Sequence, residues 1–211
     1  MKLTVTTFIT LDGVMQGPGS PDEDRSNGFE LGGWLVPFVD EGMGRAITDI
    51  FSRAEEILLG RTTYDMMYPY WSTFPDQDDV VAAALNNLPK HVATSRPDSL
   101  EWTNSHPIKG DVVAAVRELK ERPGGELQVH GSHGLLQTLI RAGLVDEFNL
   151  FTYPVVLGDG KRLFESGTIP TSMQYQSSDI TGTGVVVASY VPTGPPTLLA
   201  LPPNEGQDVI G

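Results

Sequence analysis

Residues 58–65 read Leu-Leu-Gly-Arg-Thr-Thr-Tyr-Asp, an apolar run that stops at a glycine and continues into residues that can begin a helix. The apolar run is typical of a buried strand, and Thr62 or Thr63 can cap the following helix. The same change from strand to glycine to helix recurs in residues 129–135, Val-His-Gly-Ser-His-Gly-Leu. Strands that alternate with helices in this way predict an α/β fold with a mostly parallel sheet.

The rest of the chain continues this alternation. Runs of strand character alternate with the i, i+3, i+4 spacing of helices that have one buried face. Pro69 is expected to end the second helix. The last two strands flank a Thr-Gly-Thr-Gly turn, so we expect them to form an antiparallel pair. We expect strands at residues 2–10, 56–59, 90–95, 126–130, 147–153, 173–179 and 184–191, and helices at residues 43–54, 62–67, 81–88, 112–119 and 135–140.

The length of 211 residues suits one domain with a tail. We place the domain at residues 1–191 and a Pro-rich C-terminal tail at residues 192–211, which holds five prolines. The weakly charged segment 198–201 of this tail could cover a neighbouring subunit. A loop from Asp12 to about Trp34 is long enough that we expect it to be either functional or disordered.

Composition excludes several classes of function. The chain has no cysteine, which excludes disulfides, thiol catalysis and a Cys-ligated metal site, and we predict no metal ligands. Its net charge of −13 disfavours binding to nucleic acid or to anionic membranes. No run of 18 apolar residues occurs, and the N-terminus resembles a strand more than a signal peptide. We therefore expect a cytoplasmic protein.

Three expected strand ends carry residues that suit phosphate binding. In open α/β sheets, ligands bind beyond the carboxyl ends of the strands, where helix N-termini offer free amides. Arg61 could grip a phosphate with its guanidinium, and Ser95 with Arg96 suits a ribose phosphate. The glycine-rich turn at residues 131–135 could hold a pyrophosphate on its backbone amides.

Each of these features also has a purely structural interpretation. Thr62 with Asp65 matches a capping box, and Arg96 could be an exposed loop charge. Residues 131–135 could be a tight strand-to-helix turn. Their spacing is not the Gly-x-Gly-x-x-Gly of a Rossmann dinucleotide site, and no acidic residue follows at the expected distance.

The order of these motifs resembles a known family. Residues 60–63, 95–96 and 131–134 look like the three NADPH-contacting segments of dihydrofolate reductases. The opening Thr-Leu-Asp-Gly-Val-Met at residues 10–15 resembles the reductase domain of riboflavin biosynthesis, the RibD C-terminal family. Residues 144–147 and 153–164 are similar to that family's late signature, so the resemblance runs from about residue 2 to residue 191.

The resemblance implies a dihydrofolate reductase-like three-layer α/β/α sandwich, NADPH as cofactor, and a homodimer. It places Val14 near the nicotinamide and the adenosine 2′-phosphate at Arg61, Ser95 and Arg96. The cofactor-binding residues it implies are Val14, Gly60, Arg61, Thr62, Thr63, Ser95, Arg96, Gly131, Ser132, His133, Gly134 and Leu135.

Catalytic candidates come from the residues near these strand ends. Asp12 could orient or protonate the substrate, although Leu-Asp-Gly is also an ordinary turn. His130 could exchange a proton near neutral pH, or it could be a hydrogen-bonded wall residue. Trp34, Tyr70 and Trp71 could stack a flat heterocycle. Tyr64 could do the same, but we favour core packing for it.

These observations favour an NADPH-dependent reductase of a small, planar or carbonyl- or imine-bearing metabolite. One alternative is the riboflavin-pathway 5-amino-6-(5-phosphoribosylamino)uracil reductase, and another is a non-catalytic nucleotide-binding protein of the same fold. Asp40, Glu41 and Asp49 lack the context of the pterin-binding acid of dihydrofolate reductases. No deaminase domain or second phosphate site is apparent, so the sequence leaves the substrate open.

Overall fold

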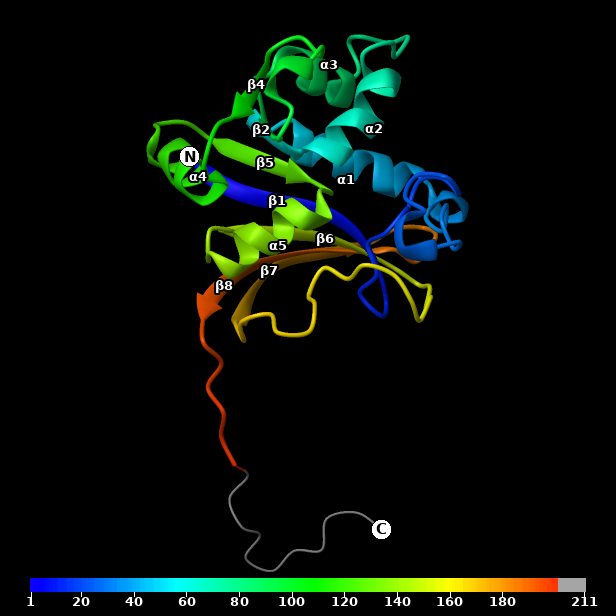
Figure 1. The fold of residues 1–211 in the computed structure, drawn as a ribbon. Helices are drawn as coiled ribbons and strands as arrows, with labels where there is room; N and C mark the ends of the chain where they lie inside the picture. Colours follow the sequence, from blue (N-terminus) through cyan, green and yellow to red (C-terminus); the bar gives the residue numbers. More distant parts are fainter. Residues whose placement is uncertain (201–211) are drawn as a thin grey trace, which may run out of the picture.

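Eight strands form one sheet in the computed structural model, which describes residues 1–200. The order across the sheet is β4-β3-β2-β5-β1-β6-β8-β7 (Figure 1). The first six strands run parallel, whereas β8 is antiparallel to β6 and β7 is antiparallel to β8. The expected mostly parallel sheet with an antiparallel C-terminal pair is confirmed.

Strands and helices are interspersed along the chain as far as β6, and a long connection leads from β6 to β7. The strands are β1 (Lys2–Thr10), β2 (Ala54–Gly60), β3 (Lys90–Ala93), β4 (Ser105–Ile108), β5 (Glu126–His130), β6 (Glu147–Tyr153), β7 (Ser172–Ile180) and β8 (Val186–Gly194). The helices are α1 (Glu41–Phe51), α2 (Arg61–Trp71), α3 (Val80–Asn87), α4 (Val112–Glu121) and α5 (His133–Arg141).

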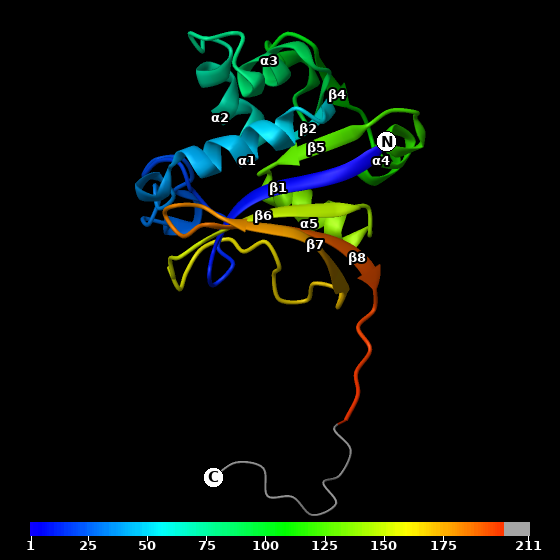
Figure 2. The same ribbon diagram turned by 180° about the vertical axis from the view of Figure 1, so that it is seen from behind.

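Helices cover both faces of the sheet, because successive side chains of each strand point to opposite faces. In β2, Leu58 packs in a buried cluster with residues of α4 and α5. Its neighbours Ile57 and Leu59 pack in another cluster with residues of α2 and α3. Figure 1 shows α4 and α5 in front of the sheet, and Figure 2 shows α1 on the opposite face. The fold is thus a three-layer α/β/α sandwich.

Two local expectations were wrong. Pro69 lies inside α2, which continues to Trp71. The aromatic rings of Tyr70, Trp71 and Phe74 pack on one another and hold this last turn although proline removes one backbone donor. The sequence also gave no sign of β4, which contains Pro107. That strand lies at the edge of the sheet, where a residue without an N–H group is tolerated.

The long loop between β1 and α1 is held by hydrogen bonds and ion pairs. The Trp34 indole N–H donates to the Gln16 carbonyl oxygen at 2.8 Å. Gln16 is buried, and its side-chain amide donates to the carbonyl oxygens of Asp24 and Ser26. The Lys161 ammonium lies 2.6 Å from the Asp24 carboxylate. Polar side chains therefore tie the loop to itself and to residue 161.

The C-terminal boundary differs from the expected one. Strand β8 continues to Gly194, three residues into the segment that the sequence suggested was tail. Leu198 and Leu199 are 86% and 88% exposed, and Figure 1 shows this segment leading away from the sheet. Residues 201–211 of the expected tail lie outside the described part of the chain. None of the helices within residues 1–200 has the length and apolar content that crossing a membrane requires.

Candidate active site

A cavity of about 1180 Å³ lies at the carboxyl ends of β1, β2 and β5. The chain leaves β2 through α2 on one face of the sheet and leaves the neighbouring β5 through α5 on the other. This divergence is a topological switch point, where open α/β sheets bind ligands. The residue ranges 60–63 and 130–135 both line the cavity.

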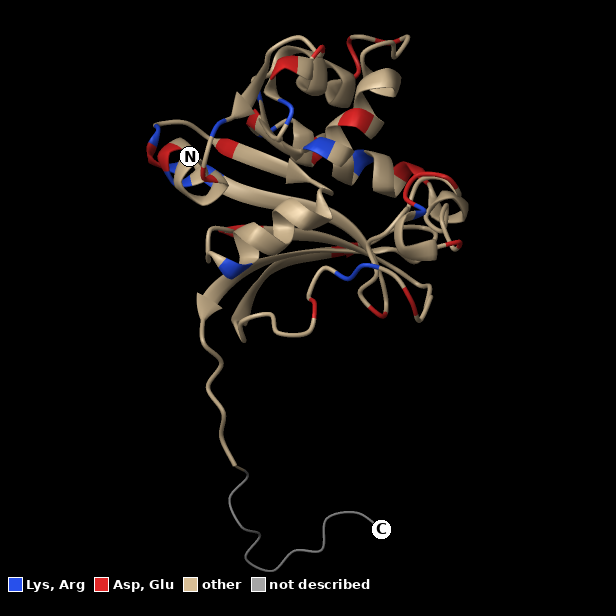
Figure 3. Ribbon diagram, in the orientation of Figure 1, with Lys and Arg blue, Asp and Glu red and all other residues tan. Residues whose placement is uncertain are grey.

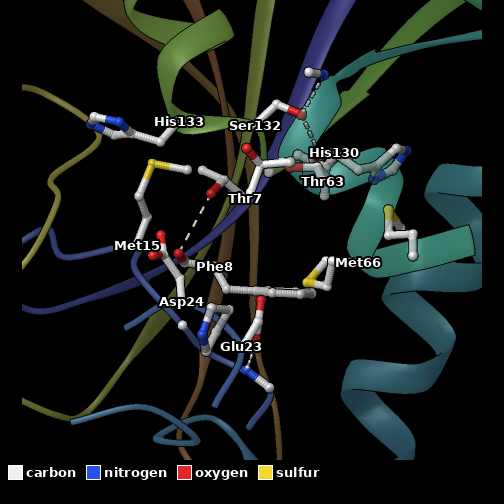
Figure 4. Close-up of a pocket in the computed structure, with 18 of the residues that line it drawn as sticks. Thr7, Phe8, Met15, Glu23, Asp24, Thr63, Met66, His130, Ser132 and His133 are labelled. Carbon is white, nitrogen blue, oxygen red and sulfur yellow. Dashed lines mark hydrogen bonds between the residues drawn. The ribbon is translucent and has the colours of Figure 1, made fainter. Parts of the chain in front are cut away.

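The strand ends predicted from the sequence meet at this cavity. The backbone N–H of Gly60 donates to the Ser132 hydroxyl at 2.9 Å. A Cβ on Gly131 would lie 3.8 Å from the methyl carbon of Thr63. In Figure 4, Thr63, His130 and Ser132 lie close together at one side of the cavity. The structure thus brings together segments that are about 70 residues apart in the sequence.

Helices α2 and α5, whose first turns line the cavity, lack the side-chain caps that α1, α3 and α4 have. Helices α1, α3 and α4 begin after Asp40, Asp79 and Asp111, and each carboxylate accepts a hydrogen bond from a backbone amide of its helix. Helices α2 and α5 begin after Gly60 and Ser132, and neither residue caps its helix with a side chain. The first amides of α2 and α5 therefore remain available to an anion.

The turn into α5 explains why Ser132 does not cap its own helix. Gly131 and Ser132 both have left-handed backbone conformations, with φ of +59° and +65°. This conformation costs a serine on the order of 1 kcal/mol or more. It turns the hydroxyl toward Gly60, where it accepts the hydrogen bond from β2. The serine joins the two strand ends and leaves the helix amides open.

Two arginines meet beside the start of α2. The Arg61 Nε atom lies 2.8 Å from one oxygen of Asp65, and Arg96 lies 3.2 Å from the other. Arg61 also donates to the Ser99 hydroxyl at 2.6 Å. The hydrogen bond that Arg61 donates to the Asp65 carboxylate raises the pKa of Arg61 above its ordinary value. Arg61 lines the cavity, whereas the exposed residues Ser95 and Arg96 are not among the residues that line it.

His130 lines the cavity, but it is uncharged at neutral pH. Its ring stacks on Phe51 with 4.1 Å between the centroids, and its Nε2 atom lies 3.1 Å from the Gln128 side-chain oxygen. Burial lowers the pKa of His130 to about 3. Of the two interpretations of His130, the burial favours a hydrogen-bonded wall residue over proton exchange near neutral pH. The neutral ring can form a wall and a hydrogen bond.

Asp12 lies outside the cavity and holds a loop instead. One carboxylate oxygen accepts hydrogen bonds from the Thr10 hydroxyl at 2.6 Å and from the Leu157 N–H at 3.2 Å. The other accepts from the Gly158 N–H at 2.8 Å and lies 3.4 Å from Arg162. The Thr10 hydrogen bond, with the backbone ones, lowers the pKa of Asp12 to about 2. This geometry gives Asp12 a structural role in place of the catalytic one suggested by the sequence.

Replacing this carboxylate should destabilise the fold in a pH-dependent way. Because the folded-state pKa lies below the ordinary value of 3.8, Asp12 stabilises the fold above about pH 4 and loses this contribution as the pH falls through 2. We expect Asp12→Asn to lower the free energy of unfolding by about 1–2 kcal/mol at pH 7, since Asp12 is partly exposed. Urea unfolding at pH 7 and near pH 2 measures this difference, which should shrink at the lower pH. Asp22→Asn, at an exposed position of the same long loop, is the control, and equal loss in both variants contradicts the assignment.

The remaining predicted contacts divide between the cavity and the core. Tyr70 and Trp71 line the cavity from the last turn of α2. Trp34 is buried against Tyr153 with 5.3 Å between the ring centroids, so its expected stacking on a substrate is not supported. Val14 is fully buried, forms an isolated β-bridge with Arg162 and does not line the cavity. Its neighbour Met15 lines the cavity in its place.

Sequence reasoning missed several polar residues of the cavity, among them Glu23 and Thr6. The carboxylate of Glu23 accepts hydrogen bonds from the backbone N–H groups of Gly19 and Ser20, and burial raises its pKa. The hydroxyl of Thr6 is buried and has no hydrogen-bond partner within residues 1–200. Neither residue belongs to a recognisable motif. The length of the loop that carries Glu23 was the one indication of a function there.

The comparisons with known proteins agree with this geometry. The family model of the RibD C-terminal domain matches residues 1–187. This chain belongs to the RibD C-terminal domain family. The chain is also similar to the Bacillus subtilis (strain 168) protein YyaP, with 28% identity over 191 residues, which cover 90% of this chain and 94% of YyaP.

Solved structures show the same fold as this RibD C-terminal domain. A putative riboflavin biosynthesis protein from Shewanella sp. PV-4 superposes with a TM-score of 0.63 at 20% identity, covering 92% of this chain and 99% of that one. Dihydrofolate reductase from Enterococcus faecalis, complexed with NADP(H) and RAB-propyl, superposes with a TM-score of 0.58 at 14% identity. That match covers 90% of this chain and 96% of the reductase. The dihydrofolate reductase-like fold expected from the sequence is confirmed.

Proposed function

We propose that this protein is an NADPH-dependent reductase that transfers a hydride to a small heterocyclic or carbonyl- or imine-bearing metabolite. The observation that carries the proposal is the pair of helix N-termini, α2 and α5, that open uncapped onto one cavity. Two such ends, joined by the Ser132–Gly60 hydrogen bond, form a cradle for a pyrophosphate. Membership of the RibD C-terminal family supports the reductase class.

The residues present fit NADPH. A Cβ on Gly134 would meet no atom within 4 Å, so the first turn of α5 is open to a large anion. Arg61 and Arg96 supply two positive charges beside α2. Both pair with Asp65, whose single negative charge can neutralise only one of them. The unpartnered hydroxyl of Thr6 offers a polar contact deeper in the cavity. These features together suit a phosphate-bearing dinucleotide with an extra phosphate on its adenosine ribose.

The chemistry of the hydride belongs to the nicotinamide of the cofactor when it is bound. The amides of α2 and α5 bind and orient its phosphates, and Met15 and Phe8 contribute apolar surface that excludes water. His130 stays neutral beside them, so it can orient a polar group but lacks the second ring proton that an imidazolium could give up at pH 7. Tyr70 and Trp71 offer aromatic surface to a flat substrate.

Protection against thermal unfolding tests this proposal. A ligand that binds the folded state at 100 times its Kd stabilises it by about 2.7 kcal/mol. We expect NADPH to raise the melting temperature at concentrations where NADH has little effect, and a substrate panel to consume NADPH. Equal protection by both cofactors contradicts the 2′-phosphate assignment, and no protection by either contradicts the reductase. Protection by NADPH without turnover of any substrate favours the non-catalytic nucleotide-binding protein.

We also propose a homodimer. Within residues 1–200, β7 pairs only with β8 and is an edge strand, and exposed strand edges readily pair with another chain. Met173, Tyr175 and Ile180 are exposed on it. Mass in solution tests the proposal. The mass in solution of a variant that lacks residues 195–211 shows whether the tail or β7 makes the contact between the two copies.

A further inference from the structure

One side of the cavity is apolar and lies away from the two phosphate-binding helix ends. We call this side the apolar wall and define it by residues of the long loop, of α1 and of the later turns of α2. It consists of Leu35, Met43, Ile47, Phe51, Met66 and Met67, all of which line the cavity. Methionine side chains adapt to irregular surfaces, so this wall can accommodate apolar ligands of different shapes.

The charges near the apolar wall leave no cation for a phosphate. Lys161 lines the cavity, but its ammonium is 2.6 Å from the carboxylate of Asp24. His130 is neutral. His133, at the start of α5, lies 2.9 Å from Glu165. Among the cavity-lining residues of the described chain, the positive charge of Arg61 lies at the opposite end, beside Asp65. A second phosphate would therefore be buried without a partner, which is costly.

Glu23 is the acidic group of this side that has no ion-pair partner within residues 1–200. Two backbone amides, of Gly19 and Ser20, fix its carboxylate. Figure 4 shows Glu23 on the loop side of the cavity, across from Thr63 and Ser132. With Asp24 and Lys161 cancelling each other, Glu23 gives this side a net negative charge. Figure 3 shows that basic residues are distributed over several elements of the fold.

We propose that the substrate of this reductase is an apolar molecule that carries no phosphate and donates a hydrogen bond from an amine or amidine nitrogen to Glu23. The inference rests on the proposed function, because it assigns the helix ends to the cofactor and the apolar wall to the substrate. It excludes the ribosyl phosphate of the riboflavin pathway as substrate. The apolar walls weaken the hydration of the Glu23 carboxylate, which strengthens its interaction with a cation.

Three compounds that share one ring test the substrate class. Naphthylmethylamine is cationic, naphthylmethanol is neutral and naphthyl phosphate is anionic. Their affinities are measured by titration calorimetry with and without saturating NADPH. We expect the amine to bind at least about 10-fold more tightly than the alcohol, since a hydrogen bond to a charged group contributes about 1.5–3 kcal/mol. The phosphate should bind most weakly when NADPH fills the helix-end cradle.

The variant Glu23→Gln tests the role of the carboxylate. Glutamine keeps an oxygen that accepts the two backbone hydrogen bonds but removes the charge, so the preference for the amine over the alcohol should disappear. Glu30→Gln changes an exposed residue of the same loop and should preserve that preference. Tighter binding of the phosphate, an unchanged preference in Glu23→Gln, or no binding of any of the three compounds overturns the proposal. The affinity for NADPH, measured separately, shows whether the proposed function itself fails.

Discussion

Replacing Gly134 with aspartate is expected to abolish NADPH binding while the protein stays folded. Gly134 is the second residue of α5 and lines the cavity. A Cβ there meets no atom within 4 Å, so the new side chain fits without a clash. Its carboxylate would occupy the first turn of α5, where it would repel a pyrophosphate. It would also accept hydrogen bonds from the backbone amides that would otherwise bind the phosphate. We expect the affinity for NADPH to fall by at least about 100-fold, or about 2.7 kcal/mol.

The same substitution should raise the stability of the protein without its cofactor. A negative charge in the first turn of a helix stabilises it by about 0.3–1 kcal/mol, and removing a helical glycine adds to this effect. Gly134→Asn is the matched control, because asparagine has the same shape without the charge. Titration calorimetry gives the affinities, and thermal unfolding gives the stabilities. NADPH affinity in Gly134→Asp equal to that in the control contradicts the cradle at α5.

Removing either arginine beside α2 is expected to abolish the preference for NADPH over NADH. Each charge-assisted contact to the 2′-phosphate contributes about 1.5–3 kcal/mol, so Arg61→Ala and Arg96→Ala should each weaken NADPH by roughly 10- to 100-fold. NADH lacks this phosphate, so its affinity should change little. The loss of NADPH affinity has a second cause. Each substitution removes one of the two arginines that compensate the negative charge of Asp65, and this charge repels an anionic cofactor.

The contribution of Asp65 can be separated from that of the arginines. Asp65→Asn removes a negative charge between the two guanidinium groups and should strengthen NADPH binding relative to NADH. Arg117→Ala changes an exposed arginine on α4, on the α4/α5 face of the sheet, and serves as the control for net charge. Titration of all four variants with both cofactors gives the ratios. A parallel loss of NADPH and NADH affinity in Arg61→Ala contradicts the 2′-phosphate assignment.

The sequence alone determined most of the strands and helices and the place of the segments proposed to bind the cofactor. Alternating side chains and glycine-marked strand ends are local signals, because each depends on neighbouring residues. They located β5 and β6 with their observed bounds. They also identified residues 60–63 and 131–135, which the structure brings to one cavity. The carboxyl ends of parallel strands lie at one edge of a sheet. Two segments that each follow a parallel strand could therefore be expected at the same edge.

The tertiary structure decided the state of each side chain, because burial and partners come from residues far apart in the sequence. Leu157 and Gly158 convert Asp12 from a catalytic candidate into a loop anchor. Phe51, 79 residues before His130, covers its ring and keeps it neutral. Glu23 belongs to no motif, and only the folding of its loop over the strand ends places it in the cavity. Charge state in a protein depends on surroundings that the local sequence does not contain.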